Sequence, residues 1–212
     1  MGSGGVAMSV ESPVYEVVRR EGQFEVRRYA QYLTASAAVR ADSHNGAAYA
    51  AFGVLADYIF GNNVAAGAIP MTVPVSTTRS AGERIAMTAP VTSERARSES
   101  LGEAAPLCTV DCAGEYIVRF TMPSRYTELD ELPQPNDPRV RLAVVPEHLA
   151  VVERFGGRLD DAMVVASVER LRDWMAGSGL VQVGEPEAAQ YDAPWKPGFV
   201  RHNEVIIPVA EG

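Results

Sequence analysis

The order of extended and helical segments repeats itself along the chain, and this repetition constrains the fold more than any other sequence feature. Extended segments lead into one helix and then into further extended segments, and the same series follows a second time. The expected helices are 47–60, a run rich in alanine that ends at Gly61-Asn62-Asn63, and 160–175, which Gly177 follows. This duplicated order predicts an α+β fold in which two similar halves pair their sheets and each half contributes one covering helix.

The expected strands are short runs of β-branched and aromatic residues with turn residues between them. They cover 15–19, 24–29, 33–39, 116–122, 140–145, 149–155 and 203–209. Glu21-Gly22-Gln23 predicts a hairpin turn between the first two strands. The near copies 69–75 and 85–91 contain prolines in β-like runs and predict an irregular hairpin, whereas the polar stretch 93–105 predicts a loop.

Composition and charge narrow the class of protein. Hydrophobic residues make up 47% and charged residues 22% of the 212 residues, which is typical of a folded globular chain. Nineteen Lys and Arg residues against 27 Asp and Glu residues give a net charge of -8, which argues against nucleic acid or an anionic membrane as a partner. No apolar run approaches the roughly 20 residues of a membrane span. We therefore expect a cytoplasmic protein.

We expect one domain over residues 10–212, preceded by residues 1–9 as a flexible N-terminus or the remnant of a tag. The chain contains two cysteines, Cys108 and Cys112. Two cysteines four positions apart, without a matching pair of histidines, are too few for a disulfide scaffold or a zinc site. This spacing favours two reduced thiols over a redox pair.

The two expected helices differ in their surface pattern. Helix 160–175 alternates an apolar stripe with charged residues, which is typical of a helix that buries one face. Helix 47–60 carries a single charge, Asp57. Phe52, Leu55 and Ile59 are expected to face the sheet, while Tyr49, Phe60 and several alanines remain on other faces, so apolar surface is left over. That surface is either covered by loops or by a second copy in a homo-oligomer, or it lines a cavity for an apolar ligand.

No catalytic motif stands out in the sequence. There is no nucleophile elbow and no glycine-rich loop between a strand and a helix, and the three histidines lack metal-ligand spacing. Met71 and Met87 occupy equivalent places in the copied segments and either present two thioethers to one site or fill the core. Trp195 and Lys196 either supply a flat apolar wall and a cation to a ligand or form a surface turn.

Five sequence motifs, in one order, resemble the SOUL haem-binding protein family (SOUL/HBP) from Val14 to about Pro208. They are Tyr15-Glu16-Val17 with Phe24-Glu25-Val26-Arg27-Arg28-Tyr29, Tyr58-Ile59-Phe60-Gly61-Asn62-Asn63, Arg84-Ile85-Ala86-Met87-Thr88-Ala89-Pro90-Val91, Phe120-Thr121-Met122-Pro123, and Tyr191-Asp192-Ala193-Pro194-Trp195 with Arg201-His202-Asn203-Glu204-Val205. The resemblance implies a distorted β-barrel of two pseudo-symmetric βαββ-like halves, each with one long helix, as in SOUL and GyrI-like proteins. It also implies binding of haem or a related tetrapyrrole, without an established catalytic activity.

The resemblance also implies a site in an apolar groove beside the first helix. The matching helix positions are Tyr49, Phe52, Ala56 and Asp57, and Lys196 matches a basic residue of the late turn. Tyr49 and Asp57 stand where the family carries cations, so one propionate is expected to lack a partner. Another branch of the family is proposed to ligate iron through a histidine at the position of Arg28. The remaining candidates for an iron ligand, if a bond forms, are Tyr49, His44, Met71 and Met87.

A porphyrin exposes a large apolar disc and two carboxylates, so it needs an apolar slot with cations at the rim. We hypothesise that haem lies between helix 47–60 and the segments that carry Met71 and Met87, with Lys196 or Arg84 near a propionate. Storage, transport and buffering of haem are all compatible with such a site.

Two other readings remain open at the level of sequence. In the first, the chain is a small-molecule hydrolase or drug-binding protein of the GyrI-like type, in which a pocket carboxylate with a raised pKa works beside an aromatic residue. The candidate carboxylates are Glu204 and Glu153, paired with Tyr116 or Trp195. The alternative for Glu204, which the residue pattern favours, is a structural residue that is hydrogen-bonded at the start of a strand. In the second, the spare apolar face of the first helix is an interface between copies of the chain.

Overall fold

The computed structural model describes residues 11–65, 83–95, 114–157, 159–191, 197 and 201–212. In chain order its elements are β1 (Tyr15–Glu21), β2 (Phe24–Tyr29), β3 (Tyr32–Ala41), α1 (His44–Ile59), β4 (Asn63–Val64), β5 (Val91–Arg95), β6 (Gly114–Thr121), the 3-10 turn η1 (Leu129–Glu131), β7 (Gln134–Pro135), β8 (Arg141–Val145), β9 (His148–Gly156), α2 (Asp161–Met175), β10 (Leu180–Gln182), β11 (Glu187–Gln190) and β12 (His202–Glu211). The expected N-terminal segment 1–9, the copy 69–75 and both cysteines lie outside the described residues.

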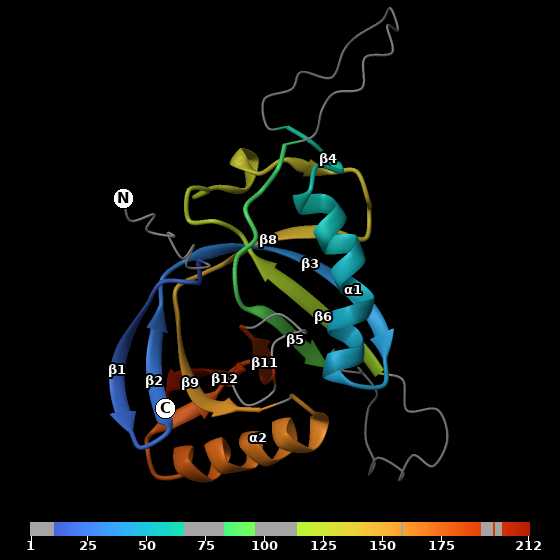
Figure 1. The fold of residues 1–212 in the computed structure, drawn as a ribbon. Coiled ribbons are helices and arrows are strands. Elements are labelled where there is room, and N and C mark those ends of the chain that lie inside the picture. The colour runs from blue at the N-terminus through green and yellow to red at the C-terminus, as the bar shows by residue number, and fades with distance from the viewer. Residues whose placement is uncertain (1–10, 66–82, 96–113, 158, 192–196, 198–200) are drawn as a thin grey trace, which may run out of the picture.

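One antiparallel sheet contains all described strands except β4 and β7, which pair with each other. Its order is β1-β2-β9-β12-β11-β5-β6-β3-β8, and β10 pairs with β12. The sheet curves strongly, with α1 beside β3, β5 and β6, and α2 beside β9 and β12 (Figure 1). In the described part of the chain no pairing joins β1 to β8, so these strands form two edges of an incompletely closed barrel.

The sheet order confirms the predicted α+β fold with two βαββ-like halves. One half is β3-α1-β5-β6 and the other is β9-α2-β11-β12, and they meet where β5 pairs with β11. Each half also pairs with a strand that comes from the sequence just before the other half. β2 precedes β3 in the chain but pairs with β9, and β8 precedes β9 in the chain but pairs with β3. The two halves are therefore related by an approximate twofold arrangement with exchanged outer strands.

Both helices begin at a side-chain cap. Asp160 accepts a hydrogen bond from the Met163 N–H at 2.8 Å, and α2 runs to Met175 as predicted. Ser43 accepts from the Gly46 N–H at 3.0 Å, so α1 begins three residues earlier than predicted. No described helix is both long and apolar enough to cross a membrane.

Two apolar clusters fill the space between the helices and the sheet. Leu55 and Tyr58 of α1 pack with Val118 of β6, and Leu171 of α2 packs with Val205 of β12. The side chains of these clusters lie on the face of the sheet that the helices cover, the helix side. Successive side chains of a strand point to opposite faces. The residues between these core positions therefore lie on the opposite face, which we call the inner face. In β2, for example, Val26 belongs to the α2 cluster, whereas Arg27 pairs with Glu204 on the inner face.

Three local predictions differ from the structure. Strand β5 extends to Arg95, so the expected loop 93–105 begins with strand residues. Residues 85–90 form no strand, and Val91 begins β5, so the described copy supplies only a strand end. Strands β10 and β11 were not predicted, because they are short and β11 consists of Glu-Ala-Ala-Gln, without β-branched or aromatic residues.

Candidate functional site

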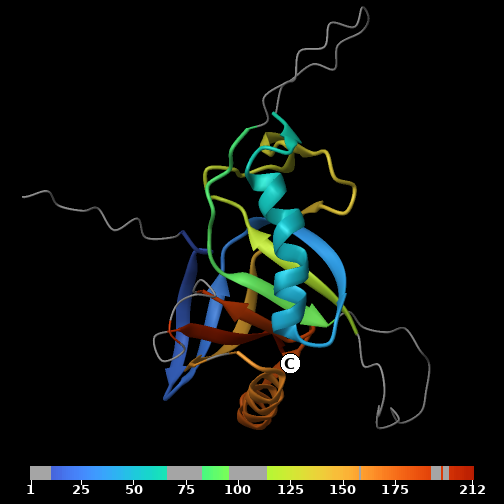
Figure 2. The ribbon, with the colours of Figure 1, turned by 45° about the vertical axis from the view of Figure 1, so that its right-hand side comes forward.

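The solvent-facing side of α1 carries a row of apolar side chains, which we call the α1 stripe: Tyr49, Phe52, Ala56 and Phe60. Their spacing of three to four residues places them on one face of the helix. The side chains of Tyr49, Phe52 and Phe60 are 57%, 39% and 56% exposed, while Ala56 is buried. Figure 2 shows α1 at the front of the molecule, with no strand or other helix in front of it. The structure thus brings together three predicted site residues with Phe60, which was expected on the spare apolar surface together with Tyr49. Leu55 and Ile59 are buried as predicted, whereas Phe52, which was expected to face the sheet, is partly exposed.

The segment that follows residue 83 runs beside the C-terminal part of α1. The Ile85 N–H donates to the Ile59 carbonyl oxygen at 2.8 Å. Beyond this contact, Met87 is 46% exposed and Arg84 is exposed. An apolar side chain and a cation are therefore exposed on a segment that meets the end of α1 at Ile59, and both were expected at the haem groove. Met71, Trp195 and Lys196 lie outside the described residues.

His44 is separated from the α1 stripe. Its side chain is buried on the sheet side of α1, where Nδ1 lies 3.0 Å from Ser93 Oγ and the ring meets the Tyr116 ring edge-on at 5.0 Å. Burial lowers the pKa of His44, although the Asp161 carboxylate opposes this change. Of the four candidate iron ligands, Tyr49 therefore belongs to the exposed stripe and His44 does not, while Met87 is exposed on the neighbouring segment and Met71 lies outside the described residues.

A buried ion pair occupies the inner face of the sheet. Arg27 donates from both terminal nitrogens to Glu204, over 2.8 and 2.9 Å, and Tyr191 Oη donates to the same carboxylate at 2.6 Å. Burial favours the protonated form of Glu204, but hydrogen bonds from His202, Arg27 and Tyr191 outweigh it and lower the pKa to about 2. Glu204 is therefore an ionised structural group at neutral pH, and the prediction of a raised pKa is wrong for it.

The two predicted carboxylates do not share a pocket. Glu153 points to the helix side of the sheet, where Arg170 of α2 donates to it over 2.9 and 3.0 Å. Tyr116 also lies on the helix side, against His44. The structure therefore does not bring Glu204, on the inner face, together with Glu153 or Tyr116.

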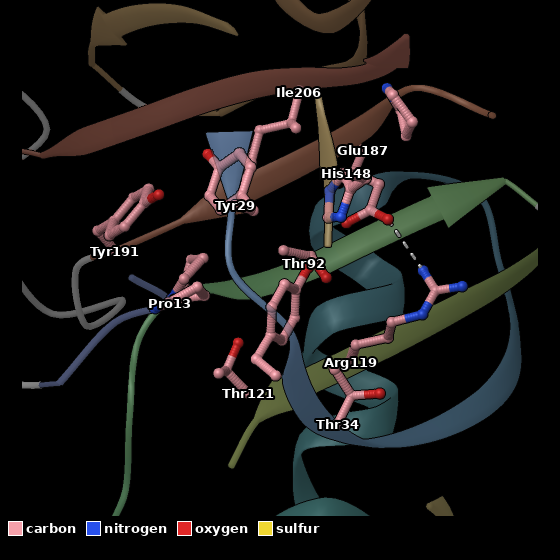
Figure 3. A pocket seen from close by; sticks show the side chains of 13 residues that line it. Pro13, Tyr29, Thr34, Thr92, Arg119, Thr121, His148, Glu187, Tyr191 and Ile206 are labelled. Atoms are coloured by element: carbon pink, nitrogen blue, oxygen red, sulfur yellow. Dashed lines mark hydrogen bonds and ion pairs between the residues drawn. The ribbon is translucent and has the colours of Figure 1, made fainter. Parts of the chain in front are cut away.

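A different carboxylate, Glu187 of β11, lines a cavity on the inner face (Figure 3). Three tyrosines surround this cavity: Tyr29 of β2, Tyr32 of β3, and Tyr191, which directly follows β11. Arg119 Nη1 lies 3.4 Å from Glu187, and its other terminal nitrogen lies 2.6 Å from Glu94. Burial raises the pKa of Glu187, and the cation of Arg119 opposes this only in part. The cavity volume is about 30 Å³, room for a water molecule or two.

Sequence comparison identifies the family. Residues 10–82 and 76–208 match the profile of the SOUL heme-binding proteins. The chain belongs to this family. Membership in the SOUL family supports binding of haem or a related tetrapyrrole, the function that the sequence motifs predicted. No curated protein matches the chain at a significant level.

Solved structures share the fold at low sequence identity. The C-terminal domain of EcmrR is 12% identical, with a TM-score of 0.57, over 90% of this SOUL chain and 98% of that domain. A hydrolase from Listeria innocua is 9% identical, with a TM-score of 0.54, over 89% of this chain and 92% of its own. At these identities the comparison establishes the fold alone.

Proposed function

We propose that this SOUL protein binds haem or a related tetrapyrrole on the α1 stripe and the adjoining Met87, for storage, transport or buffering. The observation that carries the proposal is the exposure of Tyr49, Phe52 and Phe60 on a helix whose one charged residue is Asp57. Aromatic side chains in water carry a hydration cost of roughly 25 cal/mol for each Å² of apolar surface. A flat macrocycle laid on the stripe removes much of that cost.

The residues beside the stripe suit the remaining parts of a porphyrin. Arg84 is an exposed cation on the segment that adjoins α1, and it is a candidate partner for a propionate. Tyr49 presents a phenolic oxygen, a group that serves as an axial ligand to haem iron in other proteins. Met71 and Lys196 stay in the proposal as sequence predictions. The cavity beside Glu187, with about 30 Å³, is far too small for the macrocycle.

Titration of the purified chain with haemin tests this function. The expected result is a saturable shift of the Soret band with one haemin bound per chain, while sedimentation velocity shows an unchanged oligomeric state. A chain that forms a stable dimer with and without haemin and shows no saturable shift would contradict the proposal. That outcome would instead identify the α1 stripe as an interface between copies.

A second candidate function is small-molecule binding or hydrolysis of the GyrI-like kind, and Glu187 favours it. A partly buried carboxylate with a raised pKa, surrounded by tyrosines, suits a lipophilic cation or acid catalysis, provided that Tyr32 or Tyr191 moves to enlarge the cavity. Tetraphenylphosphonium is then expected to raise the melting temperature of the wild type and of the exposed control Glu169→Gln, but not of Glu187→Gln. An equal rise in Glu187→Gln would remove this candidate.

A further inference from the structure

A pocket separate from the α1 stripe lies where the start of α1 meets the start of α2. Figure 1 shows the N-terminal end of α1 above the first turn of α2, with β5 and β6 behind them. The backbone N–H of His44 joins the two helices, because it donates to Asp161 Oδ1 at 3.0 Å. The pocket has a volume of about 270 Å³, and we call it the helix-seam pocket.

One wall of the helix-seam pocket is apolar. Val164, Val165 and Val168 of α2 line it, and Tyr116 of β6 lines it from the sheet. Val165 is 58% exposed although it is a large apolar residue, and it alternates with the buried Val164. The apolar wall thus extends from the buried Val164 to the exposed Val165, so an apolar ligand can enter from solvent along α2.

The polar end of the pocket contains the imidazole of His44. Its Nδ1 is held by Ser93 Oγ, whereas Nε2 has no hydrogen-bond partner in the described part of the chain. No buried side-chain nitrogen or oxygen among the described residues lacks a partner. Nε2 therefore faces the pocket. When Nδ1 accepts a hydrogen bond from the serine hydroxyl, Nε2 carries the ring hydrogen and donates to a ligand.

The guanidinium of Arg95 lies at the same end of the pocket. It is placed over the Tyr116 ring at 5.6 Å, and it forms no ion pair with a described carboxylate. Arg119, one strand away, pairs with two carboxylates. Gly114 makes room for Arg95, because a Cβ at that position would lie 2.8 Å from the Arg95 Nε. A guanidinium without a carboxylate partner among the described residues, beside an imidazole nitrogen that faces the pocket, suits a carboxylate.

The acidic side chains around the pocket restrict the charge of the ligand. Asp161 accepts from the His44 backbone, Glu185 has a partner of its own, and Glu169 is exposed to solvent. Arg172 donates from Nε to Gln182 at 3.1 Å and adds a second cation to the lining. With three acidic and two basic side chains in its lining, the pocket disfavours a polyanion, and only the end formed by His44 and Arg95 suits a single negative charge.

We propose that the helix-seam pocket binds a small monocarboxylate with an apolar body. The carboxylate faces His44 Nε2 and Arg95, and the apolar body lies along the valines of α2. The volume of about 270 Å³ is just below the roughly 300–1,000 Å³ of sites for drug-sized ligands, so the ligand is smaller than a tetrapyrrole. This proposal does not depend on haem binding at the α1 stripe.

Isothermal titration calorimetry of the full chain with octanoate, 1-octanol and octylamine tests the proposal. Octanoate is expected to give a saturable heat and to bind at least tenfold more tightly than the other two probes. Arg95→Gln is expected to weaken octanoate binding about tenfold, because it removes a charge-assisted hydrogen bond. Gly114→Ala, which displaces the guanidinium of Arg95 without removing it, is also expected to weaken octanoate binding. Val165→Asp weakens binding by repulsion, whereas Phe52→Asp on the α1 stripe leaves it unchanged.

Four outcomes would overturn the proposal. Octanoate without a saturable heat would show that no such ligand binds. Equal binding of 1-octanol would show that the carboxylate is not recognised, and tighter binding of octylamine would show that the acidic residues dominate. Octanoate affinity that is unchanged in Arg95→Gln, Gly114→Ala and Val165→Asp would place the bound octanoate elsewhere on the chain.

Discussion

Haemin is expected to bind at least a hundredfold more weakly when Phe52 is replaced by aspartate. The new carboxylate would lie beneath the apolar disc, and burial of an unpaired charge costs at least about 3 kcal/mol. Because the Phe52 side chain is 39% exposed, the fold is expected to tolerate the substitution. The measurement is the dissociation constant from the Soret band, with the melting temperature as a check on folding.

Val165→Asp is the matched control for this substitution. Val165 is an exposed apolar residue on the other helix, and the same change there adds the same charge outside the α1 stripe. Its haemin affinity is expected to remain within about twofold of the wild type. Equal losses in both variants would trace the effect to net charge, and unchanged affinity in Phe52→Asp would rule out the α1 stripe as the haem site.

Loss of Glu204 is expected to destabilise the fold by about 3–5 kcal/mol, because Glu204→Ala leaves the guanidinium of Arg27 buried without its main partner. The Arg27 side chain is only 3% exposed, and its remaining carboxylate contact is to Glu25. Urea denaturation at pH 7 measures the change. The double variant Arg27→Met with Glu204→Leu fills similar space without charge and is expected to regain most of the stability. Equal instability of the double variant would contradict the assignment to an unpaired charge.

The same pair predicts a dependence of stability on pH. The pKa of Glu204 in the fold, about 2, is lower than its ordinary value of 4.5. The carboxylate therefore contributes its full stability above pH 4.5, and this contribution is lost as the pH falls towards 2. Glu204→Ala is expected to lack this part of the acid titration, because it has no carboxylate to protonate.

Local sequence signals predicted α2 well and the start of α1 less well. Asp160, an apolar stripe and Gly177 together mark α2, and each signal agrees with the others. At α1, His44-Asn45-Gly46 contains weak helix formers, so the helix was expected to begin after them. Tertiary context overrides their propensity, since Ser43 caps this turn and His44 packs against β5 and β6.

The sequence likewise predicted some residues of the candidate site and missed others. The resemblance to the SOUL family grouped Tyr49, Phe52 and Ala56 in one site, and α1 carries all three on one face, although the helical pattern by itself predicted Phe52 against the sheet. Glu187 was missed because β11 has no strand pattern of its own and owes its conformation to pairing with β5 and β12. The juxtaposition of Arg95 with α2 depends on how the two halves join, and no local signal along the chain encodes it.

The exchange of β2 and β8 between the halves makes each repeat unit dependent on the other. A fragment that ended after β6 would leave β3 without its neighbour β8 and β2 without its neighbour β9. Neither unit then has a complete set of backbone partners by itself. We therefore expect the two repeat units to unfold together, as one cooperative body.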